Sequence, residues 1–345
     1  MKTKVAINGF GRIGRNAFKI AFDRSDIDIV AINDLTDTKT LAHLLKHDSA
    51  YGAYNHEVGF DDENIIIDGK PIHIYKQTDP ALLPWGDLGV DVVIESTGFF
   101  VDPQKAKAHI NPAGAKKVVL SAPAKGDGAT TIVLGVNEDK LETATDIISN
   151  ASCTTNCITP VMDVINQNFG IEKAMMTTVH SYTASQRLQD APAKDLREAR
   201  AAAVNIVPTT TGASIAAGQA LPAVAGIFGG MSVRVPTIVV SLSDIVAVTK
   251  RSVTIDEINE AFIKASKEPY YQGILDVTDE PLVSTDFVGN SHSCTIDLSL
   301  TNVVCGNMIK VVAWYDNEWG YSNRLVELVA DVGKQISKGQ TEDTN

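Results

Sequence analysis

The chain has 345 residues, too many for one typical hydrophobic core, so we expect about two domains. Thirty basic against 42 acidic residues give a net charge of −12, which excludes the basic footprint of nucleic-acid or anionic-membrane binding and favours small-molecule partners. The four cysteines are too few for a disulfide scaffold and lack Cys-x-x-Cys spacing, so we expect reduced thiols and no metal.

Two segments of the sequence, the N-terminus and the most apolar stretch, indicate where in the cell the protein is expected. Residues 1–8 run from two lysines into a short apolar alternation, without the apolar core or cleavage site of an export signal. Residues 209–231 are rich in Gly and Ala and are interrupted by Pro222, which argues against a membrane span. We therefore expect a soluble, cytoplasmic protein.

The first 150 residues alternate between short β-branched runs and helical patterns. Predicted strands cover 4–8, 27–33, 90–96, 118–121 and 147–149. This alternation is typical of βαβ units, in which a mostly parallel sheet is covered on both faces. We predict an α/β Rossmann domain here.

Beyond Ser152 the pattern changes. One helix is followed by a long charged segment, 182–208, and then by alternating runs at 231–250, 294–304 and 308–314. These runs predict an α+β domain with a mostly antiparallel sheet. A last helix is predicted over 323–336 with Ser322 as its N-cap, and 338–345 is predicted to be a loose polar tail.

The first chemical motif is Gly9-Phe10-Gly11-Arg12-Ile13-Gly14, between the first strand and an amphipathic helix. Glycines there allow a tight turn and let the backbone approach a pyrophosphate, which the helix N-terminus can bind. Asp34 ends the second strand, where an acid normally binds the adenosine ribose of NAD. Together these residues predict a dinucleotide site; a glycine turn used only for packing is the weaker alternative.

The second motif runs from Ser149 to Cys157 and opens a helix. A cysteine at a helix N-terminus has its thiolate stabilised by the helix dipole, which predicts a lowered pKa and a nucleophilic Cys153. Cys157 lies one turn deeper on a stripe with Val161, Val164 and Ile165, where it is expected to be a core residue.

A nucleophilic thiol needs a base, and His180 is the best placed of the seven histidines because it ends an apolar strand before a polar segment. A lone histidine in such a place is more often structural. The other six histidines have no comparable context and stay unassigned.

These motifs identify a resemblance to the glyceraldehyde-3-phosphate dehydrogenases over nearly the whole chain. The segments that carry it are INGFGRIGR at 7–15, SNASCTTNC at 149–157, TVHSY at 178–182, residues 205–212, RVPT at 234–237, and WYDNEWGY at 314–321. The cysteine motif and the last octapeptide are highly specific to that family.

The resemblance implies that glyceraldehyde 3-phosphate is oxidised and phosphorylated with NAD and inorganic phosphate, through a thioester on Cys153 assisted by His180, in a homotetramer. It implies a Rossmann NAD-binding domain over 1–152, with the C-terminal helix 319–336 packed back on it, and a catalytic and oligomerisation domain over 153–318. The long segment 182–208 resembles the family's loop that reaches a neighbouring subunit's cofactor site.

The resemblance also assigns binding residues. Besides the motif glycines Gly9, Gly11 and Gly14, the NAD site would include Arg12, Ile13, Asp34, Ser121 and Asn317. The attacking phosphate would be bound by Ser152, Thr154, Thr211 and Gly212, and the substrate phosphate by Thr183 and Arg234.

Three positions near the anion sites depart from the family pattern. Ser185 replaces a common aspartate, Glu198 replaces the second arginine of a paired motif, and Ile215 replaces a lysine. A charge-assisted phosphate contact is worth about 1.5–3 kcal/mol, so losing one is expected to weaken phosphate binding about tenfold or more. Ala191-Pro192 mixes features of NAD- and NADP-using members, whereas Asp34 favours NAD.

Two other functions remain open at this point. An erythrose-4-phosphate dehydrogenase would use a similar thiol and hydride scheme but release its product by hydrolysis. A thiol-bearing NAD-binding regulator would bind cofactor without producing NADH. Tyr182 and the 209–212 segment favour the phosphorylating enzyme over the first alternative.

Overall fold

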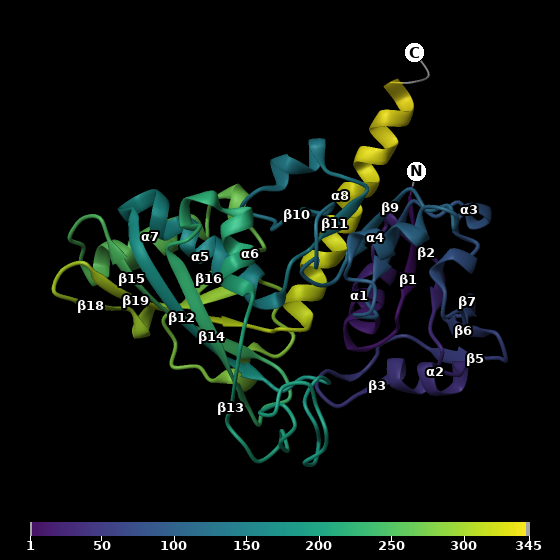
Figure 1. The fold of residues 1–345 in the computed structure, drawn as a ribbon, viewed down its shortest axis with the longest axis horizontal. Coiled ribbons are helices and arrows are strands. Elements are labelled where there is room, and N and C mark those ends of the chain that lie inside the picture. Colours follow the sequence, from purple (N-terminus) through teal and green to yellow (C-terminus); the bar gives the residue numbers. More distant parts are fainter. Residues whose placement is uncertain (1, 343–345) are drawn as a thin grey trace. The chain divides into compact units, whose positions relative to one another are not determined.

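The chain forms two compact units, each with its own sheet (Figure 1). The computed structural model describes residues 2–342. The first unit comprises the residues up to Ile132, Asp139–Ala151 and the residues from Ser322 on. The second unit comprises Val133–Glu138 and Ser152–Tyr321.

The first unit contains a nine-stranded sheet in the order β10-β11-β9-β8-β1-β2-β7-β6-β5. All neighbours from β10 to β7 are parallel, whereas β7, β6 and β5 pair antiparallel. The strands are β1 (Thr3–Asn8), β2 (Ile27–Asn33), β5 (Val58–Phe60), β6 (Asn64–Ile67), β7 (Lys70–Tyr75), β8 (Val92–Glu95), β9 (Lys117–Leu120), β10 (Thr130–Thr131) and β11 (Ile147–Ser149). A further pair, β3 (His47–Asp48) and β4 (Gly52–Ala53), lies off this sheet. The predicted Rossmann architecture is confirmed, although β5, β6, β7 and β10 were not predicted.

Both faces of this sheet are buried, as expected for parallel strands joined by helices. Ala6, Val93 and Val118 pack on one face against Trp85 and Ala106. The alternate residues of the same strands, such as Val5 and Ile7, are also fully buried. The helices of this unit are α1 (Arg12–Phe22), α2 (Thr38–Lys46), α3 (Trp85–Leu88), α4 (Pro103–Ala106) and most of α8 (Trp319–Glu342).

The last helix starts earlier and ends later than predicted. The Asp316 side chain accepts hydrogen bonds from the backbone N–H groups of Glu318 and Trp319, and helix α8 begins there. Ser322 is therefore a buried residue inside the helix, and its predicted N-cap role is wrong. The predicted polar tail is also wrong for 338–342, which are helical, while 343–345 lie outside the described residues.

Within the first unit, α8 packs closely on the first strand. A side chain at Gly333 would place its Cβ only 2.0 Å from Thr3 Oγ1. Leu325, Leu328 and Val329 on the same helix are fully buried. Helix α8 thus belongs to the core of the unit that contains β1.

The second unit contains an eight-stranded sheet in the order β13-β14-β12-β15-β19-β17-β16, with β18 paired to β19. Pairs β12/β14 and β16/β17 are parallel and the other pairs are antiparallel, so the predicted mostly antiparallel α+β domain is confirmed. The strands are β12 (Ile171–Ser181), β13 (Val207–Thr209), β14 (Phe228–Val235), β15 (Ser241–Thr249), β16 (Leu275–Thr278), β17 (Cys294–Asp297), β18 (Asn302–Val304) and β19 (Met308–Tyr315).

Helices cover one face of this sheet. Helix α5 (Cys153–Phe169) contacts β12, β15, β17 and β19, while α6 (Ala213–Ala220) and α7 (Ile255–Ala265) pack beside it. Helix α7 was not predicted, although Thr254 and Glu257 form a capping box at its start. The run predicted over 231–250 is two strands, because residues 236–240 separate β14 from β15.

All four cysteines are free, as expected. Among the helices of residues 2–342, none has the length and apolarity needed to cross a membrane. The segment from 182 to 206 contains neither helix nor strand.

Candidate active site

Helix α5 presents Cys153 at its first turn. The Ser152 side chain caps the helix by accepting a hydrogen bond from Thr155 N at 3.1 Å. Cys153 is half-buried at the helix start, whereas Cys157 is fully buried in the core with Val161, Val164 and Ile165. Cys157 is thus a core residue, as predicted.

Strand pairing brings two polar side chains to this cysteine. In the parallel pair β12/β14, His180 lies directly opposite Arg234. His180 Nε2 is 3.5 Å from Cys153 Sγ, and Arg234 Nη1 is 2.6 Å from His180 Nδ1. The structure therefore places the predicted nucleophile, the predicted base and one predicted anion-binding residue in one cluster.

The position of the imidazole proton decides what His180 can do. Nδ1 lies 2.7 Å from the Ser181 carbonyl, to which it can donate, and the same carbonyl accepts from Arg234 Nη1 at 3.1 Å. In that tautomer Nε2 is unprotonated and faces the Cys153 thiol as an acceptor. If Arg234 instead donates to Nδ1, Nε2 carries the proton and cannot accept another. Action as a base on Cys153 thus requires the Nδ1–H tautomer.

Cys153 and His180 are both uncharged near neutral pH. Burial, followed by the nearby Arg234 charge, lowers the pKa of His180 to about 3. Burial raises the pKa of the Cys153 thiol, although Arg234 and Thr154 oppose this effect. The predicted lowering of the thiol pKa is therefore wrong for the protein by itself, because loss of contact with water outweighs the favourable interactions of the thiolate.

Three buried hydroxyl groups form a hydrogen-bonded chain beside the Cys153–His180 pair. The buried Tyr315 hydroxyl lies 3.0 Å from Thr154 Oγ1 and 2.7 Å from Thr178 Oγ1. The Tyr315 ring also meets the His180 ring edge to face, with 6.0 Å between centroids. Sequence reasoning did not single out Tyr315, although it lies within the octapeptide that carries the family resemblance.

The predicted substrate residues Thr183, Thr211 and Gly212 lie in the second unit but make no contact with Cys153 that the structure records. Thr183 Oγ1 is 3.1 Å from Ser185 Oγ, and Thr211 Oγ1 accepts from Ala213 N at 3.2 Å. Gly212 is exposed at the start of α6. Ile215 on the same helix is 71% exposed, where a lysine in the family pattern would also have met solvent.

The first unit contains a cavity of about 550 Å³ at the carboxyl ends of its parallel strands. It is lined by Asn8, Gly9, Gly11, Asn33, Asp34, Leu35, Gln77, Thr78, Pro80, Ser96, Thr97, Phe99 and Phe100. Ligands of open parallel sheets bind in this position. Of the lining residues, sequence reasoning identified Gly9, Gly11 and Asp34.

The residues of this cavity fit a dinucleotide. Gly9 has φ +93°, and a Cβ there would lie 2.7 Å from Thr97 N, so no other residue fits without strain. A Cβ on Gly11 would meet nothing within 4 Å, which leaves open space over the start of α1, and no side chain caps this helix. Asp34 accepts from Phe10 N and Thr36 N at 2.8 and 2.9 Å, and its carboxylate oxygens can accept further bonds from a ribose.

The remaining predicted cofactor residues do not line this cavity. Gly14 instead packs closely on Gly9, since a Cβ on Gly14 would lie 2.1 Å from Gly9 O. Arg12 pairs with Asp48 at 2.7 Å, and Ser121 N donates to Glu95 O at 2.9 Å. Ile13 is a half-buried residue of α1. Asn317 belongs to the second unit, where its Oδ1 accepts from Ser241 Oγ at 3.0 Å.

A Rossmann unit with this cavity, in one chain with a thiol next to an imidazole, defines a nicotinamide-dependent oxidoreductase. The family model for the glyceraldehyde 3-phosphate dehydrogenase NAD binding domain matches residues 3–103, and that for the C-terminal domain matches residues 152–317. The chain belongs to the glyceraldehyde-3-phosphate dehydrogenase family, and its cofactor is NAD.

Curated relatives agree over almost the full length. The chain is 53% identical to glyceraldehyde-3-phosphate dehydrogenase 2 of Streptomyces avermitilis over 338 residues, 97% of this chain and 100% of the relative. It is 52% identical to the glyceraldehyde-3-phosphate dehydrogenase of Geobacillus stearothermophilus over 336 residues, 97% of this chain and 99% of the relative. These names do not favour the erythrose-4-phosphate or regulator alternatives.

Proposed function

We propose that this enzyme oxidises glyceraldehyde 3-phosphate with NAD and inorganic phosphate to 1,3-bisphosphoglycerate, through a thioester on Cys153. The observation that carries the proposal is the 3.5 Å separation between Cys153 Sγ and His180 Nε2 in a chain of this family. A thiol that meets an imidazole acceptor can be deprotonated as it attacks a carbonyl carbon.

The chemistry follows from this pair. Cys153 Sγ forms a bond to the aldehyde carbon while His180 Nε2 accepts the thiol proton and passes it to the carbonyl oxygen, which becomes the hydroxyl of a thiohemiacetal. His180 then accepts the hydroxyl proton as the carbonyl re-forms, which yields a thioester on Cys153. NAD, when bound, supplies the acceptor for the hydride that leaves this carbon. A phosphate oxygen attacks the thioester, the carbon–sulfur bond breaks as His180 returns its proton to the departing sulfur, and the acyl phosphate leaves.

Arg234 is proposed to bind the substrate phosphate together with Thr183. Arg234 Nε is buried and has no hydrogen-bond partner among the residues that the structure describes. A phosphate bound there would satisfy this N–H group and offset the positive charge beside His180. Because the Arg234 charge lowers the pKa of His180, a bound anion would make this imidazole a stronger base.

The attacking phosphate is proposed to bind near Ser152, Thr154, Thr211 and Gly212. Gly212 contributes an exposed backbone at the start of α6, and Thr154 lies beside the nucleophile. With Glu198 and Ile215 in place of basic family residues, the phosphate sites depend more on Arg234. We therefore expect weaker phosphate binding than the family pattern predicts.

NAD is proposed to bind in the cavity of the first unit. Gly9, Gly11 and Gly14 form the phosphate loop, and Asp34 accepts from the adenosine ribose. Arg12, Ile13, Ser121 and Asn317 stay proposed contacts by family resemblance. In this scheme residues 1–152 with helix 319–336 bind the cofactor, and residues 153–318 carry catalysis and assembly.

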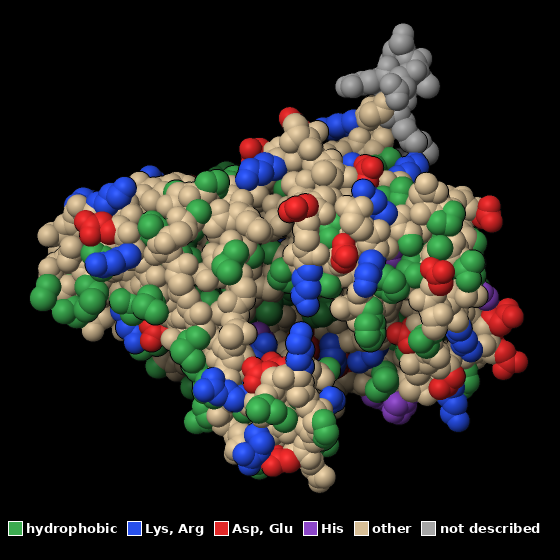
Figure 2. All heavy atoms as spheres, viewed as in Figure 1, with side chains coloured by type: hydrophobic (Ala, Val, Ile, Leu, Met, Phe, Trp, Pro, Cys, Tyr) green, Lys and Arg blue, Asp and Glu red, His purple; other side chains and the backbone are tan. Residues whose placement is uncertain are grey.

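A homotetramer is proposed because apolar side chains are exposed to solvent on two surfaces of the second unit. Met175 and Val179 on β12, and Met231 on β14, are exposed on the sheet face that alternates with the helix-covered one. Leu188 and Leu196 in the 182–206 segment are 80% and 82% exposed, and Figure 2 shows hydrophobic side chains among charged ones on the loops at the lower centre. Light scattering on the purified protein measures the mass of the assembly and so tests for a tetramer. The cytoplasmic location stays a prediction.

The proposal is tested by NADH formation at 340 nm with glyceraldehyde 3-phosphate, with and without inorganic phosphate. We expect sustained turnover only with phosphate, and loss of turnover in Cys153→Ser. Equal turnover without phosphate would indicate thioester hydrolysis. Absence of NADH despite NAD binding would contradict the proposed reaction.

A further inference from the structure

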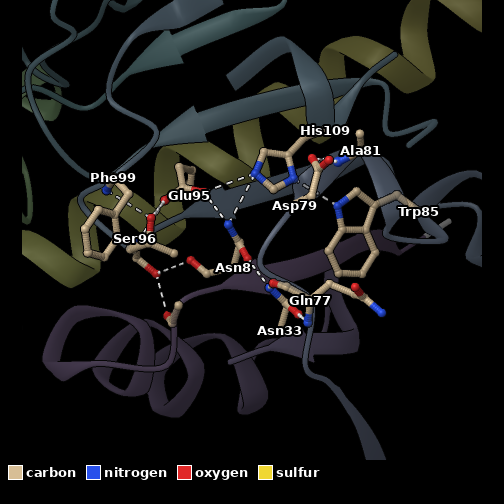
Figure 3. Close-up of polar contacts among 12 residues, drawn as sticks. Asn8, Asn33, Gln77, Asp79, Ala81, Trp85, Glu95, Ser96, Phe99 and His109 are labelled. Atoms are coloured by element: carbon tan, nitrogen blue, oxygen red, sulfur yellow. Dashed lines mark hydrogen bonds and ion pairs between the residues drawn. The ribbon is translucent and has the colours of Figure 1, made fainter. Parts of the chain in front are cut away.

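A buried polar network lies beside the NAD cavity in the first unit and takes no part in the chemistry above (Figure 3). It joins the carboxyl ends of β1, β2 and β8 through Asn8, Asn33 and Glu95, and it includes His109 from the 3-10 helix at Lys107–His109. We infer that Glu95 and His109 are positioning residues that fix two walls of the NAD cavity and thereby set the affinity for NAD. This inference rests on the proposed binding of NAD in that cavity.

The state of His109 follows from its neighbours. Trp85 Nε1–H can only donate, and it lies 3.0 Å from His109 Nδ1, so Nδ1 must be an acceptor. The single imidazole proton is then on Nε2, which lies 3.0 Å from Glu95 Oε2 and donates to it. His109 and Trp85 are both completely buried, so no water competes for these bonds. The pair therefore has one defined direction of donation.

Glu95 uses both carboxylate oxygens. Oε2 accepts from His109 and from Asn8 Nδ2, the latter at 2.5 Å. Oε1 accepts from Thr97 N at 2.8 Å and from the Thr97 hydroxyl. The Thr97 hydroxyl in turn accepts from Phe99 N at 3.1 Å, so the carboxylate fixes the turn that follows β8. Glu95 is only 2% exposed and does not itself line the cavity.

The network continues through Asn8 to the opposite wall. Asn8 Oδ1 accepts from Asn33 Nδ2 at 2.7 Å, and Asn33 Oδ1 accepts from Gln77 N at 2.9 Å. These three residues line the cavity, as do Thr97 and Phe99 on the other side of Glu95. Figure 3 shows Glu95 between the two groups, with His109 and Trp85 beyond it. One buried carboxylate thus determines the positions of both walls.

A glutamine at position 95 cannot replace this carboxylate. Four donors converge on Glu95, but an amide has one acceptor oxygen and would direct its NH₂ group at one of the two donor pairs. One wall must then shift or lose a hydrogen bond. Since a bound ligand loses affinity when its site must first be reordered, we expect weaker NAD binding rather than a slower chemical step.

Two substitutions of His109 form a matched pair. His109→Gln can place an amide N–H near the position of Nε2, which keeps the donor to Glu95 but removes the acceptor for Trp85. His109→Asn keeps an acceptor near Nδ1 for Trp85 but loses the donor to Glu95. Both remove one buried hydrogen bond, so both should lower stability, whereas only the second disturbs the carboxylate that holds the walls.

The experiment measures the Kd for NAD by titration calorimetry on the complete enzyme, together with kcat and KM in the turnover assay. We expect Kd to rise at least tenfold in Glu95→Gln and in His109→Asn, and to stay within threefold of the original enzyme in His109→Gln. At saturating NAD, kcat should stay within about twofold in all three. Tryptophan emission should change in His109→Gln, because Trp85 loses its partner.

Thr97→Val and Thr97→Ser give a second test if a core variant does not fold. The Thr97 hydroxyl is already bonded on both sides, so its removal acts through the network. We expect a severalfold higher Kd in Thr97→Val and recovery in Thr97→Ser. An unchanged Kd in Glu95→Gln, or equal Kd values in the two His109 variants, would overturn the inference. If the unsubstituted enzyme binds NAD but produces no NADH, the proposed reaction fails while the inference stands on the Kd values alone.

Discussion

Each unit of this enzyme contains a buried histidine cluster, one around His109 and one around His180. The two clusters differ in how fully their hydrogen bonds are satisfied. In the first unit, His109 has a fixed tautomer, and both carboxylate oxygens of Glu95 accept hydrogen bonds. In the second unit, His180 Nδ1 lies between a donor and an acceptor, and Arg234 Nε has no partner among the described residues.

The difference separates positioning from reaction. A network that only positions a ligand can satisfy all of its hydrogen bonds in advance, which lowers the cost of binding. A reacting cluster must exchange protons, so its imidazole cannot have both nitrogens permanently committed. The unpartnered Arg234 N–H group and the uncharged thiol are states that an anionic substrate is expected to change.

The largest effect should come from the nucleophile. Cys153→Ser is expected to lower kcat by on the order of 10³-fold or more, because a hydroxyl is a far weaker nucleophile in the same place. NAD affinity should not change, since Cys153 belongs to the reacting cluster. Cys305→Ser is the matched control, because this exposed cysteine lies outside both clusters. Comparable losses in the two variants would contradict the assignment.

The base should have the next largest effect. His180→Asn is expected to lower kcat by about 10²- to 10⁴-fold through loss of the proton acceptor. Alkylation of Cys153 by iodoacetamide should also become slower at neutral pH, because burial raises the thiol pKa and no base remains to assist. Labelling followed by peptide mass spectrometry distinguishes Cys153 from the buried Cys157. Unchanged alkylation and turnover would show that the 3.5 Å contact is only structural.

Arg234 should affect substrate binding more than chemistry. Arg234→Leu is expected to raise KM for glyceraldehyde 3-phosphate at least tenfold, since a charge-assisted phosphate contact contributes about 1.5–3 kcal/mol. It should also raise the pKa of His180, because the Arg234 charge contributes to its lowered value. Steady-state kinetics gives the first quantity and imidazole NMR the second. A variant with normal KM would remove Arg234 from the substrate site.

The cluster around His180 should also respond to acid. The pKa of His180 falls from its ordinary 6.5 to about 3 on folding, so its contribution to stability is complete above pH 6.5 and is lost as the pH falls toward 3. At pH 5 the loss is about 2 kcal/mol. Urea unfolding at pH 7 and pH 5 should therefore show a smaller acid loss in His180→Asn than in the original enzyme. Equal losses would place the acid-sensitive group elsewhere.

A smaller effect is expected from the hydroxyl chain under the thiol. Tyr315→Phe removes the buried hydroxyl shared by Thr154 and Thr178 and should cost about 1–3 kcal/mol of unfolding free energy. Turnover should fall only modestly, because Tyr315 does not contact Cys153 in the recorded hydrogen bonds. Urea unfolding checks the cost, and a loss of turnover as large as that of His180→Asn would assign Tyr315 a direct role.

The sequence predicted the helices and strands that are encoded by residue types and spacing within the element itself. The strands at 27–33 and 147–149 are β-branched runs, and their predicted bounds agree with β2 and β11. Helix α7 also had a local signal in its capping box, which was overlooked. The start of α8 depended on Asp316, a cap three residues before Trp319 that the apolar periodicity did not reveal.

The site was only partly predictable for a different reason. Cys153 and His180 were found from motifs, but the neighbourhood of His180 and Arg234 arises from pairing of β12 with β14, which lies outside local sequence patterns. His109 had no sequence context at all, because its partners Trp85 and Glu95 meet it only in the folded unit. The thiol pKa was predicted in the wrong direction because burial cannot be read from the helix position alone.

The most direct test of the account is a single-turnover experiment with NAD and glyceraldehyde 3-phosphate but no inorganic phosphate. The account predicts a rapid burst of about one NADH per subunit, an acyl adduct on the peptide that contains Cys153, and renewed turnover when phosphate is added. Continued NADH formation without phosphate, or a burst with no adduct on Cys153, would contradict it.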